Sequence, residues 1–210
     1  MPNFFSDVLS QPDQRSLLEE LYRDRRVYSY RHSESIWMEA EEIWVVCRGV
    51  VQISVLHPSG DEVLLGLAGP SMPFGLPFSA LNSYNARALS PVDLLCLALS
   101  DVEGSPILAQ GILWNLNRRL RQTEALLALT GHRRIEERLR HLLLLLKDEI
   151  GQPIAEGTRL SIKLTHQQLA SAIGTSRVTV TRLLGKLRDE QWVKLSRDRH
   201  IVITSQATLS

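Results

Sequence analysis

Basic side chains near the C-terminus form a pattern suited to binding a polyanion. Arg177, Arg182 and Lys186 lie in one predicted helix, and Arg197 and Arg199 follow in a predicted turn. A guanidinium group can bind a phosphate, and it can also bind guanine through two parallel hydrogen bonds. Arginine in the first turns of a helix opposes the helix dipole, so we attribute these side chains to a partner rather than to helix stability.

The sequence lacks the residue sets that catalysis or metal binding requires. It contains no nucleophile–base pair and no phosphate-binding glycine loop, and no Cys/His spacing resembles a zinc site. Cys47 and Cys96 are too few for a cluster held by four thiolates. We therefore expect neither an enzyme nor a bound metal or other cofactor. Apolar neighbours favour buried, reduced cysteines, with a disulfide as the alternative.

Residues 162–203 begin with two short amphipathic helices separated by a tight turn. Thr165 and Gln168 form a capping box at the start of the first helix, and Gly174 supplies the turn. Ser176 caps the second helix. The apolar inner faces consist of Leu169, Ala170 and Ile173 in the first helix and Val180, Leu183, Leu184 and Leu187 in the second. This combination predicts a helix-turn-helix whose second helix enters the major groove of DNA.

Two short strands after the second helix predict a wing. Residues 192–195 and 200–203 are rich in apolar side chains, and residues 196–199 form the turn between them. The basic side chains of this wing are available for phosphate contacts. The residues that we predict to contact DNA are Thr165, Thr175, Ser176, Arg177, Val178, Thr181, Arg182, Lys186, Lys194, Arg197 and Arg199.

A long helix should precede this module. Ser105 is suited to the N-cap position with Pro106 as the first helical residue, and Gly131 ends the helix. One side of the helix follows the three-four spacing of a heptad seam, made of Leu113, Leu116, Leu120, Thr123, Leu127 and Thr130. We interpret this seam as a homodimer interface. The alternative is a helix that packs on its own β-domain. A second helix over residues 134–150 should bury Ile135, Leu139, Leu142, Leu143 and Leu146.

The N-terminal half is typical of a small antiparallel β-structure. Short apolar or β-branched runs at 43–46, 50–56, 62–67 and 92–97 are separated by residues that favour turns. Such a series of strands indicates a small barrel or jelly roll. A short amphipathic helix is predicted for residues 13–26, ahead of the strands.

Charge is divided unevenly along the 210 residues, although the net charge is only +1. Residues 132–210 carry 14 Lys and Arg against 8 Asp and Glu, while residues 1–131 carry 10 against 15. The basic part therefore suits a polyanionic partner. We predict three parts: a β-roll over residues 1–103, a dimerisation helix over 104–131 and a winged helix-turn-helix over 132–210.

The chain shows no pattern of a membrane or export segment. No stretch reaches the roughly 18 uncharged apolar residues that a membrane helix needs. The N-terminus lacks the basic start and apolar core of a signal peptide. We therefore expect a cytoplasmic protein with no membrane partner.

The whole chain resembles the CRP/FNR family of transcription regulators. Within it, residues 166–174 and 176–185, and the triplet Gln122-Thr123-Glu124, resemble NtcA-like cyanobacterial regulators. The resemblance implies an α+β fold with an N-terminal antiparallel β-roll (a cyclic-nucleotide-binding-like jelly roll), a long dimerisation helix and a C-terminal winged helix-turn-helix. It also implies a homodimer that binds double-stranded DNA at a palindromic promoter site with GTA and TAC half-sites, and that contacts RNA polymerase.

The sensor residues depart from the family pattern. Family members that bind a cyclic nucleotide carry glutamate after Phe-Gly, but Leu76 follows Phe74 and Gly75 here, and the phosphate-binding arginine falls at Asn82. In the NtcA-like group, whose effector is 2-oxoglutarate, Asn82 again replaces an arginine. The resemblance implies a candidate effector site made of Phe74, Gly75, Leu76, Asn82, Arg119 and Glu124. The effector stays open between 2-oxoglutarate and none, the latter with a degenerate pocket.

Overall fold

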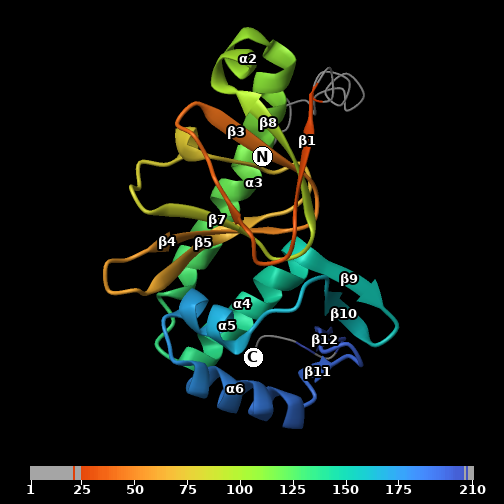
Figure 1. The fold of residues 1–210 in the computed structure, drawn as a ribbon. Coiled ribbons are helices and arrows are strands. Elements are labelled where there is room, and N and C mark those ends of the chain that lie inside the picture. Colours follow the sequence, from red (N-terminus) through yellow and green to blue (C-terminus); the bar gives the residue numbers. More distant parts are fainter. Residues whose placement is uncertain (1–20, 22–24, 206, 208–210) are drawn as a thin grey trace, which may run out of the picture. The chain divides into compact units, whose positions relative to one another are not determined.

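The computed structural model describes residues 21, 25–205 and 207. Most of the helix predicted for residues 13–26 therefore lies outside the described part of the chain. Within the described part, no helix is long and apolar enough to cross a membrane. Figure 1 labels the helices and strands.

The chain divides into two compact units. One unit spans Met1–Val51 and Ala68–Arg121, and the other spans Gln52–Leu67 and Gln122–Ser210. Helix α3 (Pro106–Leu129) contributes its first part to one unit and its last part to the other. The three-part division predicted from the sequence stays a prediction.

The first unit is built on an antiparallel sheet with the strand order β1-β8-β3-β6. Its strands are β1 (Val27–Tyr30), β3 (Glu42–Arg48), β6 (Pro73–Phe74) and β8 (Val92–Ala98). Ile43 pairs with Leu97 and Val45 pairs with Leu95, so these apolar side chains share one buried face. In the same unit, β2 (Ser35–Ile36) pairs antiparallel with β7 (Tyr84–Ala88).

Two helices complete the core of the first unit. Val102 of α2 (Leu99–Gly104) and Leu108 and Ile112 of α3 pack against the buried face of β3 and β8. The hydroxyl of Ser105 accepts a hydrogen bond from the backbone N–H of Leu108 at 3.4 Å, as its predicted N-cap position requires. The predicted start of the long helix is thereby confirmed.

The second unit contains a hairpin and a four-stranded sheet. The hairpin joins β4 (Val51–Leu56) to β5 (Glu62–Ala68) through a turn in which His57 N donates to Asp61 O at 2.8 Å. The sheet has the order β11-β12-β10-β9 and is antiparallel throughout. Its strands are β9 (Gly151–Ile154), β10 (Gly157–Leu160), β11 (Val193–Leu195) and β12 (Ile201–Thr204).

Helix α4 (Ile135–Ile150) packs against this sheet. Its buried side chains recur at helical spacing and are Leu139, Leu142, Leu143, Leu146 and Ile150. Ile135 is only half-buried, because it stands in the first turn of the helix. The four predicted leucines therefore form a buried helix face, as predicted.

The α+β fold class predicted from the sequence is confirmed: antiparallel sheets precede the long helix, and a helix-turn-helix follows. The four predicted strand runs correspond to β3, β4, β5 and β8, whereas the other strands of the first unit and the β9–β10 pair were not predicted. Cys47 and Cys96 are free thiols, but each is half-buried rather than buried.

Candidate nucleic-acid interface

The first helix of the helix-turn-helix is α5 (His166–Ile173), and the predicted capping box sets its start. Thr165 Oγ1 accepts a hydrogen bond from Gln168 N at 3.1 Å, and Gln168 Oε1 accepts one from Thr165 N at 2.8 Å. These two bonds satisfy N–H groups that have no partner within the helix. Leu169 and Ala170 are buried, so this helix presents its apolar side to the unit's interior.

The turn after α5 depends on glycine. Gly174 has φ of 66° and ψ of 50°, a left-handed conformation in which a side chain is unfavourable. Its N–H donates to Ala170 O, and Thr175 N donates to the same carbonyl at 3.0 Å. Ser176 then caps the next helix, because its Oγ accepts from Thr179 N at 3.2 Å.

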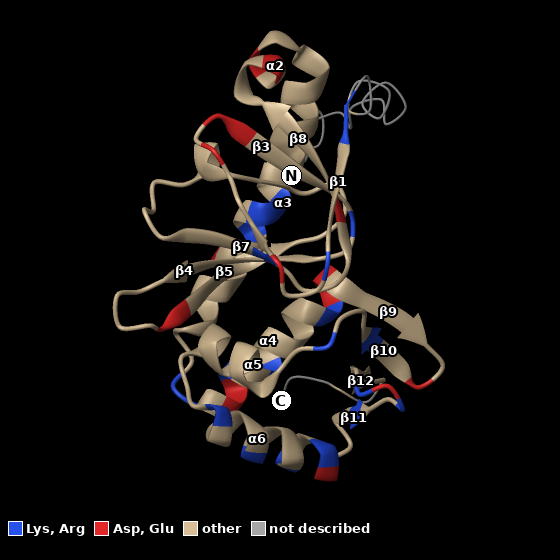
Figure 2. Cartoon of the chain, in the orientation of Figure 1, with Lys and Arg blue, Asp and Glu red and all other residues tan. Residues whose placement is uncertain are grey.

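The second helix, α6 (Arg177–Asp189), has two opposite faces. The buried face is apolar and consists of Val180, Leu183, Leu184 and Leu187. The other face is exposed, and Figure 2 shows that basic residues are spaced along the helix. Arg177 and Arg182 are exposed there, and the side chain of Val178 is 78% exposed. A valine that is so largely exposed contributes little to the core, so this face is suited to a partner.

Thr181 is exposed on the same face and is held in place by two contacts. Its hydroxyl donates to Arg177 O at 2.9 Å, and its oxygen lies 2.7 Å from Nδ1 of His166. The contact with His166 joins the first turn of α5 to α6. His166 was not among the predicted site residues. The only sign in the sequence that it lies near the site is its position one residue after the capping Thr165.

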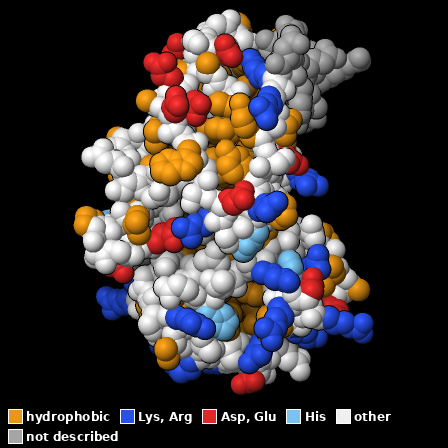
Figure 3. All heavy atoms as spheres, in the orientation of Figure 1, with side chains coloured by type: hydrophobic (Ala, Val, Ile, Leu, Met, Phe, Trp, Pro, Cys, Tyr) orange, Lys and Arg blue, Asp and Glu red, His pale blue; other side chains and the backbone are white. Residues whose placement is uncertain are grey.

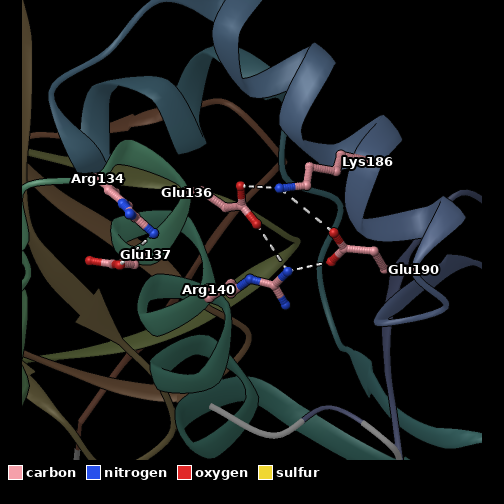
Figure 4. Close-up of polar contacts among 6 residues, drawn as sticks. All are labelled: Arg134, Glu136, Glu137, Arg140, Lys186 and Glu190. Carbon is pink, nitrogen blue, oxygen red and sulfur yellow. Dashed lines mark hydrogen bonds and ion pairs between the residues drawn. The ribbon is translucent and has the colours of Figure 1, made fainter. Parts of the chain in front are cut away.

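Lys186, by contrast, is engaged within the protein (Figure 4). Its Nζ lies 2.6 Å from Glu136 Oε2 and 3.7 Å from Glu190 Oε1. Arg140 completes the network by pairing with both carboxylates and by lying over the Trp192 ring at 5.2 Å. The hydrogen bond from Lys186 is the main cause that lowers the pKa of Glu136 below its ordinary value.

This network braces α6 against α4. Its acidic members, Glu136 and Glu190, were not predicted from the sequence. The signal that could have revealed them is the four-residue spacing of Glu136 from Arg140 and of Lys186 from Glu190. Because its ammonium already has two carboxylate partners, Lys186 is less available to a phosphate than Arg177 or Arg182.

The wing is formed by β11 and β12, which pair antiparallel as predicted. In the turn between them, Ser196 N donates to His200 O and Arg199 N donates to Ser196 O, both at 2.9 Å. Arg199 has φ of 64°, in the left-handed region of backbone conformation. This conformation is unfavourable for any residue that carries a side chain. Lys194, Arg197 and Arg199 are all exposed.

Asp198 fixes the shape of this turn. It accepts a hydrogen bond from Ser196 Oγ at 2.5 Å and pairs with Arg159 of β10 at 3.1 Å. The hydroxyl of Ser196 is the main cause that lowers the pKa of Asp198. Arg159 and Asp198 were not predicted, because they are 39 residues apart. Arg159 is thus engaged within the sheet, and the exposed cations of the wing are Lys194, Arg197 and Arg199.

Basic side chains gather on the second unit. Figure 3 shows several basic side chains on the part of the surface where Figure 1 places α4 to α6 and the β9–β12 sheet. Of the predicted contact residues, Thr165, Ser176 and those on the outer side of α6 and the wing are exposed, while Thr175 is half-buried. An exposed helix flanked by a basic wing can place base-reading and phosphate-binding groups on one duplex.

Arg119 has internal partners in the first unit. Its Nη2 donates to the hydroxyl of Tyr84 at 2.7 Å, and its Nη1 donates to Pro73 O at 3.4 Å. Tyr84 is buried, and burial is the main cause that raises its pKa, against the lowering influence of Arg119. Tyr84 was absent from the predicted site, since nothing in its spacing relates it to Arg119.

The other residues of the candidate effector site differ in burial and are divided between the two units. Phe74 and Gly75 are buried, and φ of 149° at Gly75 together with a main-chain oxygen of Glu42 leaves no room for a side chain. Asn82 is exposed. Leu76 is half-buried, and Glu124, in the other unit, is exposed. The residues therefore provide one guanidinium, already bonded, and no second cation.

The predicted seam of α3 is largely uncovered. Leu113, Leu120 and Leu127 are 50%, 57% and 70% exposed and stand seven residues apart. Leu116 instead packs partly against the core of the first unit. Thr123 is exposed, and its hydroxyl donates to Leu65 O at 3.3 Å. A row of exposed leucines with a seven-residue period is typical of a helix that pairs with another.

Comparisons with known proteins agree with this geometry. A sequence model described as the Crp-like helix-turn-helix domain matches residues 137–210. The global nitrogen regulator of Nostoc sp. (strain PCC 7120) is 35% identical over 181 residues, which cover 81% of this chain and 80% of that protein. The regulatory protein CysR of Synechococcus elongatus is also 35% identical, over 81% of this chain and 80% of its own. A solved structure of a CRP-family transcriptional regulator from Thermus thermophilus shares the fold, with a TM-score of 0.73 at 22% identity, covering 86% of this chain and 93% of that one.

Proposed function

Because the chain belongs to the CRP/FNR family of transcription regulators, we propose that it binds a palindromic promoter site as a homodimer. The observation that carries the proposal is the two-faced helix α6, whose apolar side is buried while Arg177, Val178 and Arg182 project outward. In helix-turn-helix proteins such a helix lies in the major groove with its N-terminal residues on the base edges. The basic wing then supplies phosphate contacts beside it.

In this proposal, the exposed leucines of α3 form the dimer interface. A parallel pair of these helices would bury Leu113, Leu120 and Leu127 against their symmetry copies. A twofold dimer presents two identical recognition helices and therefore reads a twofold site. Resemblance to the NtcA-like group favours half-sites that contain GTA and TAC. A promoter site makes RNA polymerase a further partner and the cytoplasm the place of action.

A second candidate function concerns the effector. The hydrogen bond between Arg119 and Tyr84 favours a regulator that binds DNA without a small molecule, because the guanidinium already has a partner within the protein. A 2-oxoglutarate-responsive regulator is the competing form. It would have to displace Tyr84 and would gain only one cation for two carboxylates.

Selection of binding sites from a random DNA pool tests the proposal. We expect the full-length protein to recover palindromic sites whose half-sites lie about one helical turn apart, roughly 34 Å. Sedimentation of the protein with a selected duplex should show two chains per duplex. Recovery of sites without twofold symmetry, or of no sequence preference at all, contradicts the proposed function.

A further inference from the structure

One arginine of α4 holds three backbone carbonyls that belong to different segments of the second unit. Arg138 Nε donates to His132 O at 2.8 Å, Nη2 donates to Thr130 O at 3.2 Å, and Nη1 donates to Ile173 O at 3.4 Å. Arg138 is half-buried, and each of its three nitrogens has a carbonyl partner. The planar fork of a guanidinium suits such a set, whereas an ammonium is a single point of donation.

The three carbonyls mark two turning points of the chain. Thr130 and His132 lie in the connection between α3, which ends at Leu129, and α4. Ile173 is the last residue of α5, immediately before the glycine turn that leads into α6. Carbonyls at the C-terminal ends of helices lack partners within the helix and carry partial negative charge. Arg138 therefore neutralises two such ends with one cation.

The surroundings make this link a rigid one. Helices α4 and α5 pack against each other (Figure 1). Nη1 of Arg138 also lies 4.0 Å from the place where a Cβ on Gly174 would stand, so the guanidinium is close to the turn itself. Arg138 thus links the α3–α4 connection to the turn before α6, at the opposite end of α5 from the connection that precedes it.

We propose that Arg138 is a positioning residue that ties the end of α3 to the helix-turn-helix, so that specific DNA binding depends on a side chain that does not touch DNA. This inference rests on the proposed function, because it concerns the placement of the recognition helix. Arg138 sets where α6 begins relative to the connection that follows α3. Without the three bonds, the turn at Gly174 loses this direct link to the α3–α4 connection.

The test uses full-length Arg138→Met and Arg138→Lys, with Arg134→Met as the matched control. Arg134 stands four residues earlier, and its side chain is 84% exposed. Its Nη1 is as far as 4.0 Å from Glu137 Oε1, so the pair is a weak one.

Affinity for a selected palindromic duplex and for a random duplex is measured across salt concentrations, well below the melting temperature of each variant. Both Arg138 variants should lose about tenfold in affinity for the palindrome, as expected for a coupling residue. Their affinity for random DNA and their salt dependence should match the parent, and Arg134→Met should bind the palindrome as the parent does.

Other results overturn the inference. Parental affinity of folded Arg138→Met and Arg138→Lys for the palindrome removes the positioning role. Equal loss on both duplexes with a shallower salt dependence makes Arg138 a phosphate contact instead. Failure of both variants to fold assigns the residue to stability alone. A parent protein that shows no preference for any duplex contradicts the proposed function itself, which separates that failure from failure of this inference.

Discussion

The hydroxyl of Tyr84 accepts a 2.7 Å hydrogen bond from Arg119, whose guanidinium carbon also lies 5.7 Å from the centre of the Tyr84 ring. Tyr84 lies on a strand and Arg119 on α3, so the pair joins a sheet to the long helix within the first unit. The phenol is buried and neutral, and its oxygen occupies a position that a carboxylate of an effector would need. Arg119, the one cation among the residues of the candidate effector site, thus already has an internal partner.

The first prediction is that 2-oxoglutarate does not bind. Displacing Tyr84 would remove the Arg119 hydrogen bond from its buried hydroxyl, and Asn82 offers no second guanidinium. Calorimetry at millimolar ligand should give no saturable heat, and DNA affinity should not change on adding it. A saturable heat that Arg119→Ala abolishes, together with a ligand-dependent rise in DNA affinity, makes the protein a 2-oxoglutarate-responsive regulator.

A second prediction concerns the dimer. Leu120→Asp places a carboxylate against its symmetry copy in an apolar seam, and an unpaired buried charge is strongly unfavourable. Sedimentation should show a concentration-dependent dimer for the parent and a monomer for this variant. Ile107→Asp is the control, because Ile107 is also exposed on α3 but lies off the seam. A dimer that survives Leu120→Asp places the interface elsewhere.

The helix-turn-helix was predictable because its determinants lie close together in the sequence. Thr165 and Gln168 set the start of α5, Gly174 has the left-handed conformation that the turn needs, and Ser176 sets the start of α6. Each of these acts on its neighbours within four residues, so spacing alone reveals them. The exposed and buried faces of α6 follow from helical periodicity for the same reason.

The contacts that support the site were not predictable from spacing. Lys186 pairs with Glu136 across 50 residues, and Arg119 bonds Tyr84 across 35. Such pairs depend on how the helices and strands pack. The β9–β10 pair was not predicted for another reason. Proline in a short polar run argues against a strand, and Pro153 lies in β9. The structure tolerates this proline because β9 is an edge strand, where one missing N–H donor need not break the sheet.

A third prediction concerns pH. The rings of His132 and His141 stack with centroids 4.1 Å apart, and burial, followed by His132, lowers the pKa of His141 below its ordinary 6.5. Between the lowered and the ordinary value the unfolded chain binds more protons, so the free energy of unfolding falls as pH falls through that window. The thermal midpoint should be lower at about pH 5.5 than at about pH 7.5. His141→Gln should reduce this difference, whereas His57→Gln, in the turn after β4, should not. An unchanged difference in His141→Gln removes His141 as the cause.

A fourth prediction separates phosphate contacts from base reading. Arg199→Gly removes a charge from the wing while keeping a residue that accepts the left-handed conformation found there. Binding should weaken for every DNA sequence alike, and the salt dependence should fall by about one unit of slope per protomer. Lys186→Met should change that slope less, because Glu136 and Glu190 already engage its ammonium. An equal fall of the slope in the two variants makes Lys186 a phosphate contact as well.

The last prediction concerns the base sequence read by α6. Arg177 and Val178 are exposed in its first turn, where helix-turn-helix proteins reach base edges. An arginine can bind O6 and N7 of guanine, and a valine side chain can pack against the methyl group of thymine. Arg177→Ala should cost roughly 1–3 kcal/mol of binding free energy per half-site and relax the preference for guanine in the GTA element. Val178→Ala should weaken the preference for thymine beside it without altering the salt dependence. Both effects are measured by repeating the site selection with each variant and comparing base frequencies. Guanine preference that persists in Arg177→Ala means that another residue reads this base, and the assignment of Arg177 is then wrong.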